Sequence, residues 1–142
     1  MYIKVMNNIP EIYEVSQLRK DNPQVSFPEV ISDEVLSEFN VFKVIETEEP
    51  VCDKLVSKTS SSFVKNKNGQ WVQEWFISSL DLEVASANIR SVRDNLLFEC
   101  DWTQLPDAPV DQQAWANYRK SLRDITNNPG FPGSVVWPYK PK

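Results

Sequence analysis

The sequence predicts an α+β protein. A mixed α/β N-terminal region with an antiparallel β-hairpin is followed by an antiparallel helical hairpin and a proline-rich tail. Three observations support this prediction: short apolar runs fill the first half of the chain, an Asn-Gly pair separates two of these runs, and two segments of the second half have helical spacing of apolar residues. We expect two domains, residues 1–80 and residues 81–142.

The N-terminal region, up to about Pro50, mixes short apolar runs with charged residues. Ser and Asp side chains cap helix starts because they accept hydrogen bonds from free backbone N–H groups. Ser16 is therefore expected to begin a helical turn, and Ser32 or Asp33 to begin a short helix. The expected elements are a strand, the helical turn, the short helix and a second strand, at residues 1–6, 16–20, 33–39 and 41–45.

The second region, residues 51–80, is expected to form antiparallel β structure. The Asn68-Gly69 pair lies between two apolar runs, residues 62–65 and 71–77. Asn and Gly tolerate the positive φ angles that both central residues of a type I′ turn require, so this pair predicts a two-residue β-hairpin turn. The polar segment before the first run is expected to be a flexible or edge segment.

Two helices are expected after Asp81, because apolar residues recur there at intervals of three and four positions. Asp111 is placed to cap the second helix, and the segment from Asn127 to Gly130 is placed to end it. Two such helices joined by a short loop pack antiparallel through their apolar stripes. The stripes are Leu82, Ala85, Ile89, Val92 and Leu96 in one helix, and Trp115, Tyr118, Leu122 and Ile125 in the other.

The composition argues against several classes of function. The chain lacks histidine, the commonest general acid–base and metal ligand, and its three glycines form no phosphate-binding loop. Its formal net charge of −5 opposes attraction to nucleic acid. No stretch reads as a signal peptide or membrane span. We expect no cofactor, metal, nucleic acid or membrane partner, and free thiols at Cys52 and Cys100.

Clustered carboxylates are the remaining candidates for catalysis. Glu46, Glu48 and Glu49 lie together, and Asp94 and Asp101 lie on or near one expected helix. A sugar-cleaving enzyme needs two carboxylates about 5 to 10 Å apart in a cleft. Because these clusters fall in expected turns or on solvated helix faces, we expect the protein not to be an enzyme.

Large aromatic and arginine side chains gather in the last third of the chain, and two interpretations of them are open. They form a core and its ion pairs, with Arg side chains paired to Asp94, Asp101 or Asp124, or they bind a partner protein, since aromatics and Arg are enriched at interface hot spots. The proline-rich tail either wraps the helices or offers an extended edge to a partner. The candidate partner-binding residues are Trp102, Trp115, Tyr118, Arg119, Arg123, Phe131 and Trp137.

The same third of the chain, about residues 91–138, resembles the phage tail assembly chaperone family. Many Trp, Arg and Pro positions coincide in order and spacing, which makes the resemblance specific. The segments that carry it are RDNLL at 93–97, DWTQLPD at 101–107, WANYR at 115–119, LRDI at 122–125, GFP at 130–132 and VWP at 136–138.

The resemblance implies a protein that binds the distal part of a phage tail fibre or receptor-binding protein and aids its folding or trimerisation. It implies no cofactor and no catalytic residue. The expected location is the host bacterial cytoplasm during assembly. In the alternative interpretation the protein stays on the virion tail, as a structural protein or fibre-tip adhesin. Self-association is left open.

Overall fold

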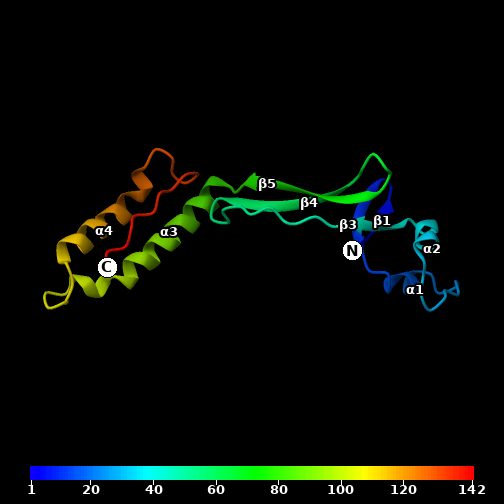
Figure 1. Cartoon of the computed structure of the whole chain (residues 1–142), viewed down its shortest axis with the longest axis horizontal. Helices are drawn as coiled ribbons and strands as arrows, with labels where there is room; N and C mark the ends of the chain where they lie inside the picture. Colours follow the sequence, from blue (N-terminus) through cyan, green and yellow to red (C-terminus); the bar gives the residue numbers. More distant parts are fainter. The chain divides into compact units, whose positions relative to one another are not determined.

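The computed structural model describes all 142 residues of an α+β protein with four α-helices and a five-stranded sheet (Figure 1). The chain divides into two compact units. The first unit comprises residues 1–50 and 59–76, and the second comprises residues 51–58 and 77–142. None of the helices combines the length and the apolar character that crossing a membrane requires.

The sheet has the strand order β2-β1-β3-β5-β4. Strand β1 pairs antiparallel with β2 and with β3, whereas β3 and β5 pair in parallel. Strands β2 and β4 therefore form the two edges of the sheet. The strands are β1 (Tyr2–Met6), β2 (Ile9–Tyr13), β3 (Val41–Ile45), β4 (Ser57–Lys65) and β5 (Trp71–Ser79).

Strand β2 was not expected from the sequence, and the turn before it explains how it forms. Asn7 and Asn8 both have positive φ, at 52° and 65°, and they connect β1 to β2 as a two-residue turn. Positive φ at both central residues is the signature of a type I′ turn. Pro10 lies within β2 and lacks the backbone N–H that a central strand needs for pairing on both sides. The proline is tolerated here because β2 is an edge strand.

The turn between β4 and β5 differs from the predicted type I′ turn. Gly69 has positive φ, at 76°, but Asn68 does not. The Gly69 N–H donates to the Asn66 carbonyl at 3.0 Å, which closes a loop of three residues instead of two. The Asn66 side-chain oxygen accepts from the N–H groups of Asn68 and Gln70 at 2.9 and 3.0 Å. This side chain stabilises the longer loop. The two residues that flank the loop and pair with each other are therefore Asn66 and Gln70.

Two short helices contribute to the core of the first unit. Helix α1 (Gln17–Asp21) follows Ser16, whose side chain makes no capping hydrogen bond. Helix α2 (Asp33–Glu38) is capped by Ser32, whose hydroxyl accepts from the Val35 N–H at 3.5 Å. The core centres on Leu18, Leu36 and Val41, which are fully or almost fully buried, and aromatic side chains including Tyr2, Tyr13, Phe27 and Phe39 pack against them.

Asp21 ties α1 to the sheet of the first unit. Its carboxylate accepts from the Tyr13 hydroxyl at 2.6 Å and from the Gln17 amide at 2.9 Å, and it forms an ion pair with Lys4 at 3.5 Å. Hydrogen bonding from Tyr13 is the largest influence that lowers the pKa of Asp21. Burial and the same hydrogen bond raise the pKa of Tyr13 from 10.0 to about 12. The neutral phenol and the ionised carboxylate therefore stabilise each other.

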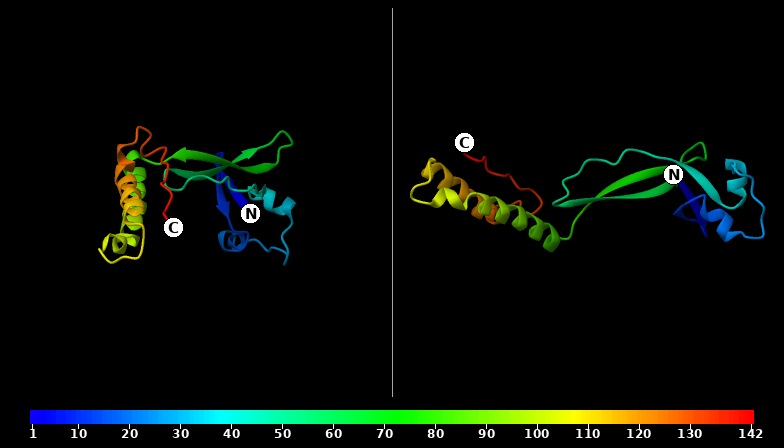
Figure 2. Two further views of the ribbon diagram at one scale, coloured as in Figure 1. Left: turned by 60° about the vertical axis from the view of Figure 1, so that its left-hand side comes forward. Right: turned by 90° about the horizontal axis from the view of Figure 1, so that it is seen from below.

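The second unit is built on two long helices that lie side by side and run in opposite directions (Figures 1 and 2). Helix α3 (Leu82–Glu99) is capped by Asp81, and helix α4 (Gln112–Asp124) is capped by Asp111 as the sequence predicts. Short 3-10 helices follow each of them, η1 (Asp101–Gln104) after α3 and η2 (Ile125–Asn127) after α4.

The predicted stripe of the second helix is buried throughout: Trp115, Tyr118 and Leu122 lie in α4, and Ile125 lies at the start of η2. In the predicted stripe of α3, Ala85 and Ile89 are buried, Val92 and Leu96 are partly buried, and the first position is exposed. Leu82 lies in the first turn of α3, and 71% of its surface is exposed. The helical spacing is correct there, but no core side chain covers that turn. The core of this unit consists of Ile89, Cys100, Trp115, Tyr118, Leu122 and Ile125.

Candidate partner-binding surface

Trp115 is the centre of an aromatic cluster inside the second unit. Its ring lies 6.3 Å from that of Trp102 and 5.8 Å from that of Tyr118, in tilted and edge-to-face arrangements. Such geometries are favourable between aromatic rings. Lys140 lies over the Trp115 ring at 6.0 Å, and its ammonium also pairs with Glu99 at 3.5 Å. Trp115 and Tyr118 are therefore core residues, with about 5% of their surfaces exposed.

Arg119 is buried and joins α4 to the end of α3. Its Nη1 donates to the Leu97 carbonyl at 2.7 Å and lies 3.1 Å from the Cys100 sulfur. Its Nη2 forms an ion pair with Asp101 at 2.7 Å. Burial alone lowers the pKa of Arg119, but the contacts with Cys100 and Asp101 outweigh burial and raise it above its ordinary value. The guanidinium therefore stays charged and donates to one carbonyl, that of Leu97, in the last turn of α3.

The C-terminal tail contacts the same core. Phe131, Val135 and Trp137 are partly buried and pack against the core of the second unit. The guanidinium of Arg90 in α3 lies 5.4 Å from the centre of the Phe131 ring, which is a cation–π contact. Figure 1 shows the tail, in red, returning alongside the two helices. The side chains of these tail residues therefore lie partly against the core and partly in the solvent.

The seven residues proposed from the sequence thus divide by exposure. Trp115, Tyr118 and Arg119 are buried, so in this conformation they stabilise the unit and offer little contact area. Phe131 and Trp137 are partly buried. Trp102 is half exposed and Arg123 is exposed, which leaves these two side chains accessible. Arg119 and Arg123 are one helical turn apart, yet only Arg119 points into the unit.

Other exposed apolar side chains were not among the candidates. Phe98 near the end of α3 is 78% exposed, and Leu105 after η1 is 55% exposed. Together with Trp102 they follow spacings of four and three residues across the end of α3 and η1. The sequence contains a signal for Phe98, because it is an aromatic residue that falls outside the apolar stripe of its helix. We call Phe98, Trp102 and Leu105 the exposed apolar row.

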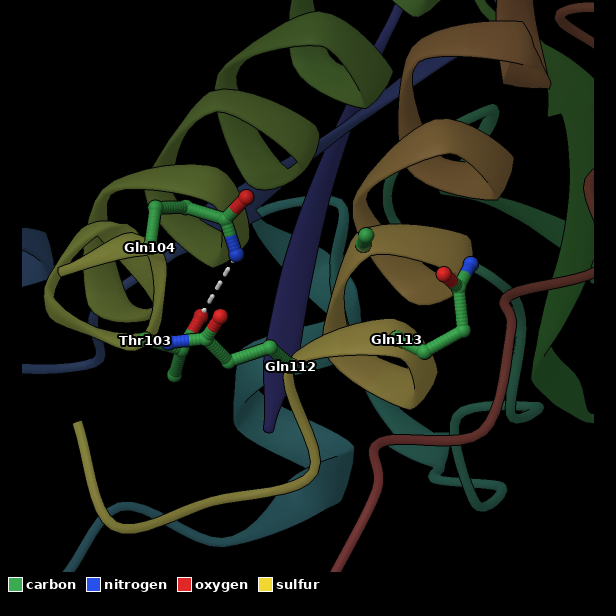
Figure 3. A pocket seen from close by; sticks show the side chains of 5 residues that line it. Thr103, Gln104, Gln112 and Gln113 are labelled. Carbon is green, nitrogen blue, oxygen red and sulfur yellow. Dashed lines mark hydrogen bonds between the residues drawn. The ribbon is translucent and has the colours of Figure 1, made fainter. Parts of the chain in front are cut away.

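A pocket of about 250 Å³ opens between η1 and the first turns of α4 (Figure 3). Amide side chains dominate its lining, and no lining residue is charged. Thr103, one of the lining residues, is fully buried, and its hydroxyl donates to the Cys100 carbonyl at 2.7 Å. The pocket is lined by Thr103, Gln104, Gln112, Gln113 and Ala116.

Most of the clustered carboxylates have a partner within the protein, and Asp101 pairs with Arg119 as described above. Glu46 pairs with the N-terminal ammonium, and Glu49 accepts a hydrogen bond from the Thr59 hydroxyl. Asp94 pairs with its neighbour Arg93 at 2.7 Å. No three side chains of the kinds that bind metals gather closely enough to hold an ion. Both cysteines are free thiols, as predicted.

The second unit has a match among known protein families. No curated protein and no solved structure matches the chain. Residues 86–142 match the model of a family described as phage tail assembly chaperone protein. This segment contains most of α3, both 3-10 helices, α4 and the tail. The C-terminal part of the chain is therefore similar to the phage tail assembly chaperone family.

Proposed function

We propose that this protein is a tail-fibre assembly chaperone of a tailed phage, which binds the distal part of a fibre and aids its folding or trimerisation without catalysing a reaction. The observation that carries this proposal is the family match over residues 86–142. Trp115 and Arg119 of that segment are buried, so these two residues maintain the framework of the unit.

A physical mechanism follows from the surfaces of the two units. A fibre chain that awaits trimerisation exposes apolar strands and unpaired strand edges, which drive aggregation. In the second unit, the exposed apolar row offers contact area for such strands. In the first unit, the edge strand β4 has one neighbour and can accept a strand by β-addition. The net charge of −5 keeps the complex soluble.

Co-expression with the tail fibre of the same phage tests the proposal. The expected result is a larger soluble, trimeric fraction of fibre and a complex that survives size-exclusion chromatography. A double variant, Phe98→Ser with Leu105→Ser, should reduce both effects while the protein stays folded, because both side chains are exposed. Val136→Ser is a matched control, since Val136 is 82% exposed and lies outside the row.

The outcomes separate the proposal from its alternative. If the wild-type protein neither binds the fibre nor raises its soluble yield, the chaperone function is wrong. If it binds the fibre and mass spectrometry finds it in stoichiometric amounts on purified virions, the protein is a structural component or fibre-tip adhesin. A chaperone that leaves after assembly would be depleted from those particles.

A further inference from the structure

Strand β4 pairs with β5 in one unbroken register, and this register fixes the direction of each backbone group of β4. At one end of the pair, the Asn66 N–H donates to the Gln70 carbonyl at 2.9 Å. At the other end, the Leu80 N–H donates to the Val56 carbonyl at 2.8 Å. Each strand has nine residues between these two bonds, so the strands pair residue for residue without a bulge.

The outward backbone groups of β4 have no partner in the protein from Thr59 onward. In an antiparallel pair, residues bonded to the neighbouring strand alternate with residues whose N–H and C=O groups point away from it. Since Val56 and Asn66 bond towards β5, every second residue between them does so too. The Ser57 N–H points outward and donates to the Asp53 carbonyl at 2.8 Å. The free outward groups belong to Thr59, Ser61, Phe63 and Lys65.

The two edges of the sheet differ in how they are protected against further pairing. Natural proteins block an edge with a short strand, a proline, a bulge or charged side chains. Strand β2 has five residues and contains Pro10 and Glu11. Strand β4 has nine residues, and its segment from Thr59 to Val64 has neither a proline nor a charged residue. The edge formed by β4 is therefore open to a further strand, whereas the edge formed by β2 is blocked.

The charged groups on β4 are all positive, although the chain as a whole has a net charge of −5. Lys58 and Lys65 lie near the ends of β4, Lys67 follows in the loop, and none of the three is in an ion pair of the protein. The Lys65 ammonium lies 5.2 and 5.9 Å from the ring centres of Trp71 and Phe42. These cation–π contacts position the ammonium and leave it without a carboxylate partner.

We propose that β4 receives an extended acidic segment of the fibre chain, which pairs as a further strand with the outward groups from Thr59 to Lys65. The inference rests on the proposed chaperone function and assigns it a contact site and the charge of the segment bound there. Alternating N–H and C=O groups at the spacing of a strand are matched by another polypeptide backbone, so this edge selects a strand over a small molecule.

Charge decides between a fibre segment and a second copy of this chain. A second copy of β4 would bring Lys58 and Lys65 to an edge that already carries the same two positive charges and no acidic residue. Like charges across an interface oppose association, whereas complementary charges favour it. A segment with a carboxylate beside Lys65 gives this ammonium the ion pair that it lacks within the protein.

Hydrogen exchange measured by NMR tests the backbone pairing directly, with the protein alone and with the purified C-terminal fragment of the phage's own fibre. In the free protein, the Ser61 and Phe63 amides should exchange fast because they point outward. Their exchange should slow by about tenfold or more in the complex. The Ser62 and Val64 amides bond towards β5 and should be slow in both samples, which makes them an internal control.

Substitutions at Ser61 test the same pairing by isothermal titration. Ser61→Pro removes an outward N–H and no bond to β5, so it should weaken binding about tenfold or more while the sheet stays intact. The Ser61 hydroxyl also accepts from the Gln73 side chain at 3.1 Å. Ser61→Ala loses this same bond but keeps the N–H, and should retain the affinity within about threefold. If Ser61→Pro fails to fold, hydrogen exchange on the wild type decides the question.

The charge of the bound segment has its own test. Lys65→Glu should weaken binding about tenfold or more, because it places a carboxylate where the acidic segment lies. Lys20→Glu makes the same charge change at an exposed position of α1 and should leave the affinity unchanged. Equal binding by Lys65→Glu and the wild type would show that the segment is not acidic and would overturn that part of the inference.

The remaining outcomes separate this inference from the proposed function. Binding by the wild type without slower exchange at Ser61 and Phe63 would overturn strand addition at β4 and leave the chaperone function standing. Absence of binding by the wild type would overturn both. A dimer in which these two amides exchange slowly without the fibre would show that a second copy occupies the edge, and would overturn the inference.

Discussion

The guanidinium of Arg119 in α4 reaches the carboxylate of Asp101 in η1, with 2.7 Å between Nη2 and Oδ1. The same side chain donates to the Leu97 carbonyl at the end of α3. One arginine therefore connects three consecutive elements of the second unit. The planar fork of its guanidinium allows this, because several donors point in fixed directions.

Replacing Arg119 with Met should destabilise the protein by about 2 to 3 kcal/mol, since the Leu97 carbonyl loses a charge-assisted hydrogen bond. Arg119→Lys should restore only part of this, because an ammonium cannot reach both ends of the network. The measurement is urea unfolding followed by tryptophan fluorescence. Arg123→Met on the same helix is the control, and an equal loss there would contradict the role assigned to Arg119.

Leu122→Ala should cost about 2 to 5 kcal/mol, because Leu122 is fully buried and its truncation leaves a cavity between the helices. Val136→Ala in the tail removes apolar atoms that are already exposed, so its effect should stay within about 0.5 kcal/mol. Thermal unfolding of the two variants in parallel measures the difference. Similar melting temperatures would show that the helix pair is not closely packed.

Gly69→Ala should destabilise the β4–β5 turn by about 1 to 2 kcal/mol, because an L-residue is strained at a φ of 76°. No atom lies within 4 Å of the added Cβ, so the cost comes from the backbone alone. Gly69→Asn should cost less, since Asn tolerates positive φ. Denaturant midpoints measure the order, and Gly133→Ala, whose Cβ meets an ordinary contact at 3.7 Å, should be close to neutral.

The Tyr13–Asp21 contact should make the first unit lose stability at alkaline pH. The pKa of Tyr13 is raised from 10.0 to about 12 in the folded protein. The neutral phenol is the favoured form, so its contribution is complete below pH 10 and disappears as the pH rises towards about 12. Tyr13→Phe should remove this pH dependence, whereas Tyr139→Phe at a position 98% exposed should not.

Urea unfolding at several alkaline pH values measures this loss, and the absorbance of the phenolate reports the titration directly. At the acid end the sign is reversed. The pKa of Asp21 is lowered, so its contribution is present above its unfolded pKa of 3.8 and is lost as the pH falls through the folded value. A Tyr13 phenol that titrates at its unperturbed pKa would exclude the hydrogen bond to Asp21.

The sequence best predicts the helices that have both a regular spacing of apolar residues and a capping residue at their start. Helix α4 has Asp111 as its cap and three buried stripe residues, and the fourth stripe residue, Ile125, is buried in η2 directly after it. Strand β2 was missed because Pro10 argues against a strand unless its edge position is known. The β4–β5 turn was assigned the wrong type because Asn66, outside the Asn-Gly pair, contributes the side chain that sets the loop length.

The candidate surface was harder to predict than the fold. Periodicity identifies the side of a helix that is apolar, but it does not show whether an arginine such as Arg119 turns inward to satisfy carbonyls. Phe98 could have been proposed, because it falls outside the stripe of α3. The glutamine pocket has no sequence signal, since η1 and α4 bring Gln104 and Gln113 together only after the chain folds.

Each of the two compact units has its own buried cluster, and each cluster takes its residues from one unit only. An unfavourable replacement inside one cluster can therefore be compensated by a change in that same cluster. The residues of the two clusters are then free to diverge at different rates, which accords with a family match that lies wholly within the second unit.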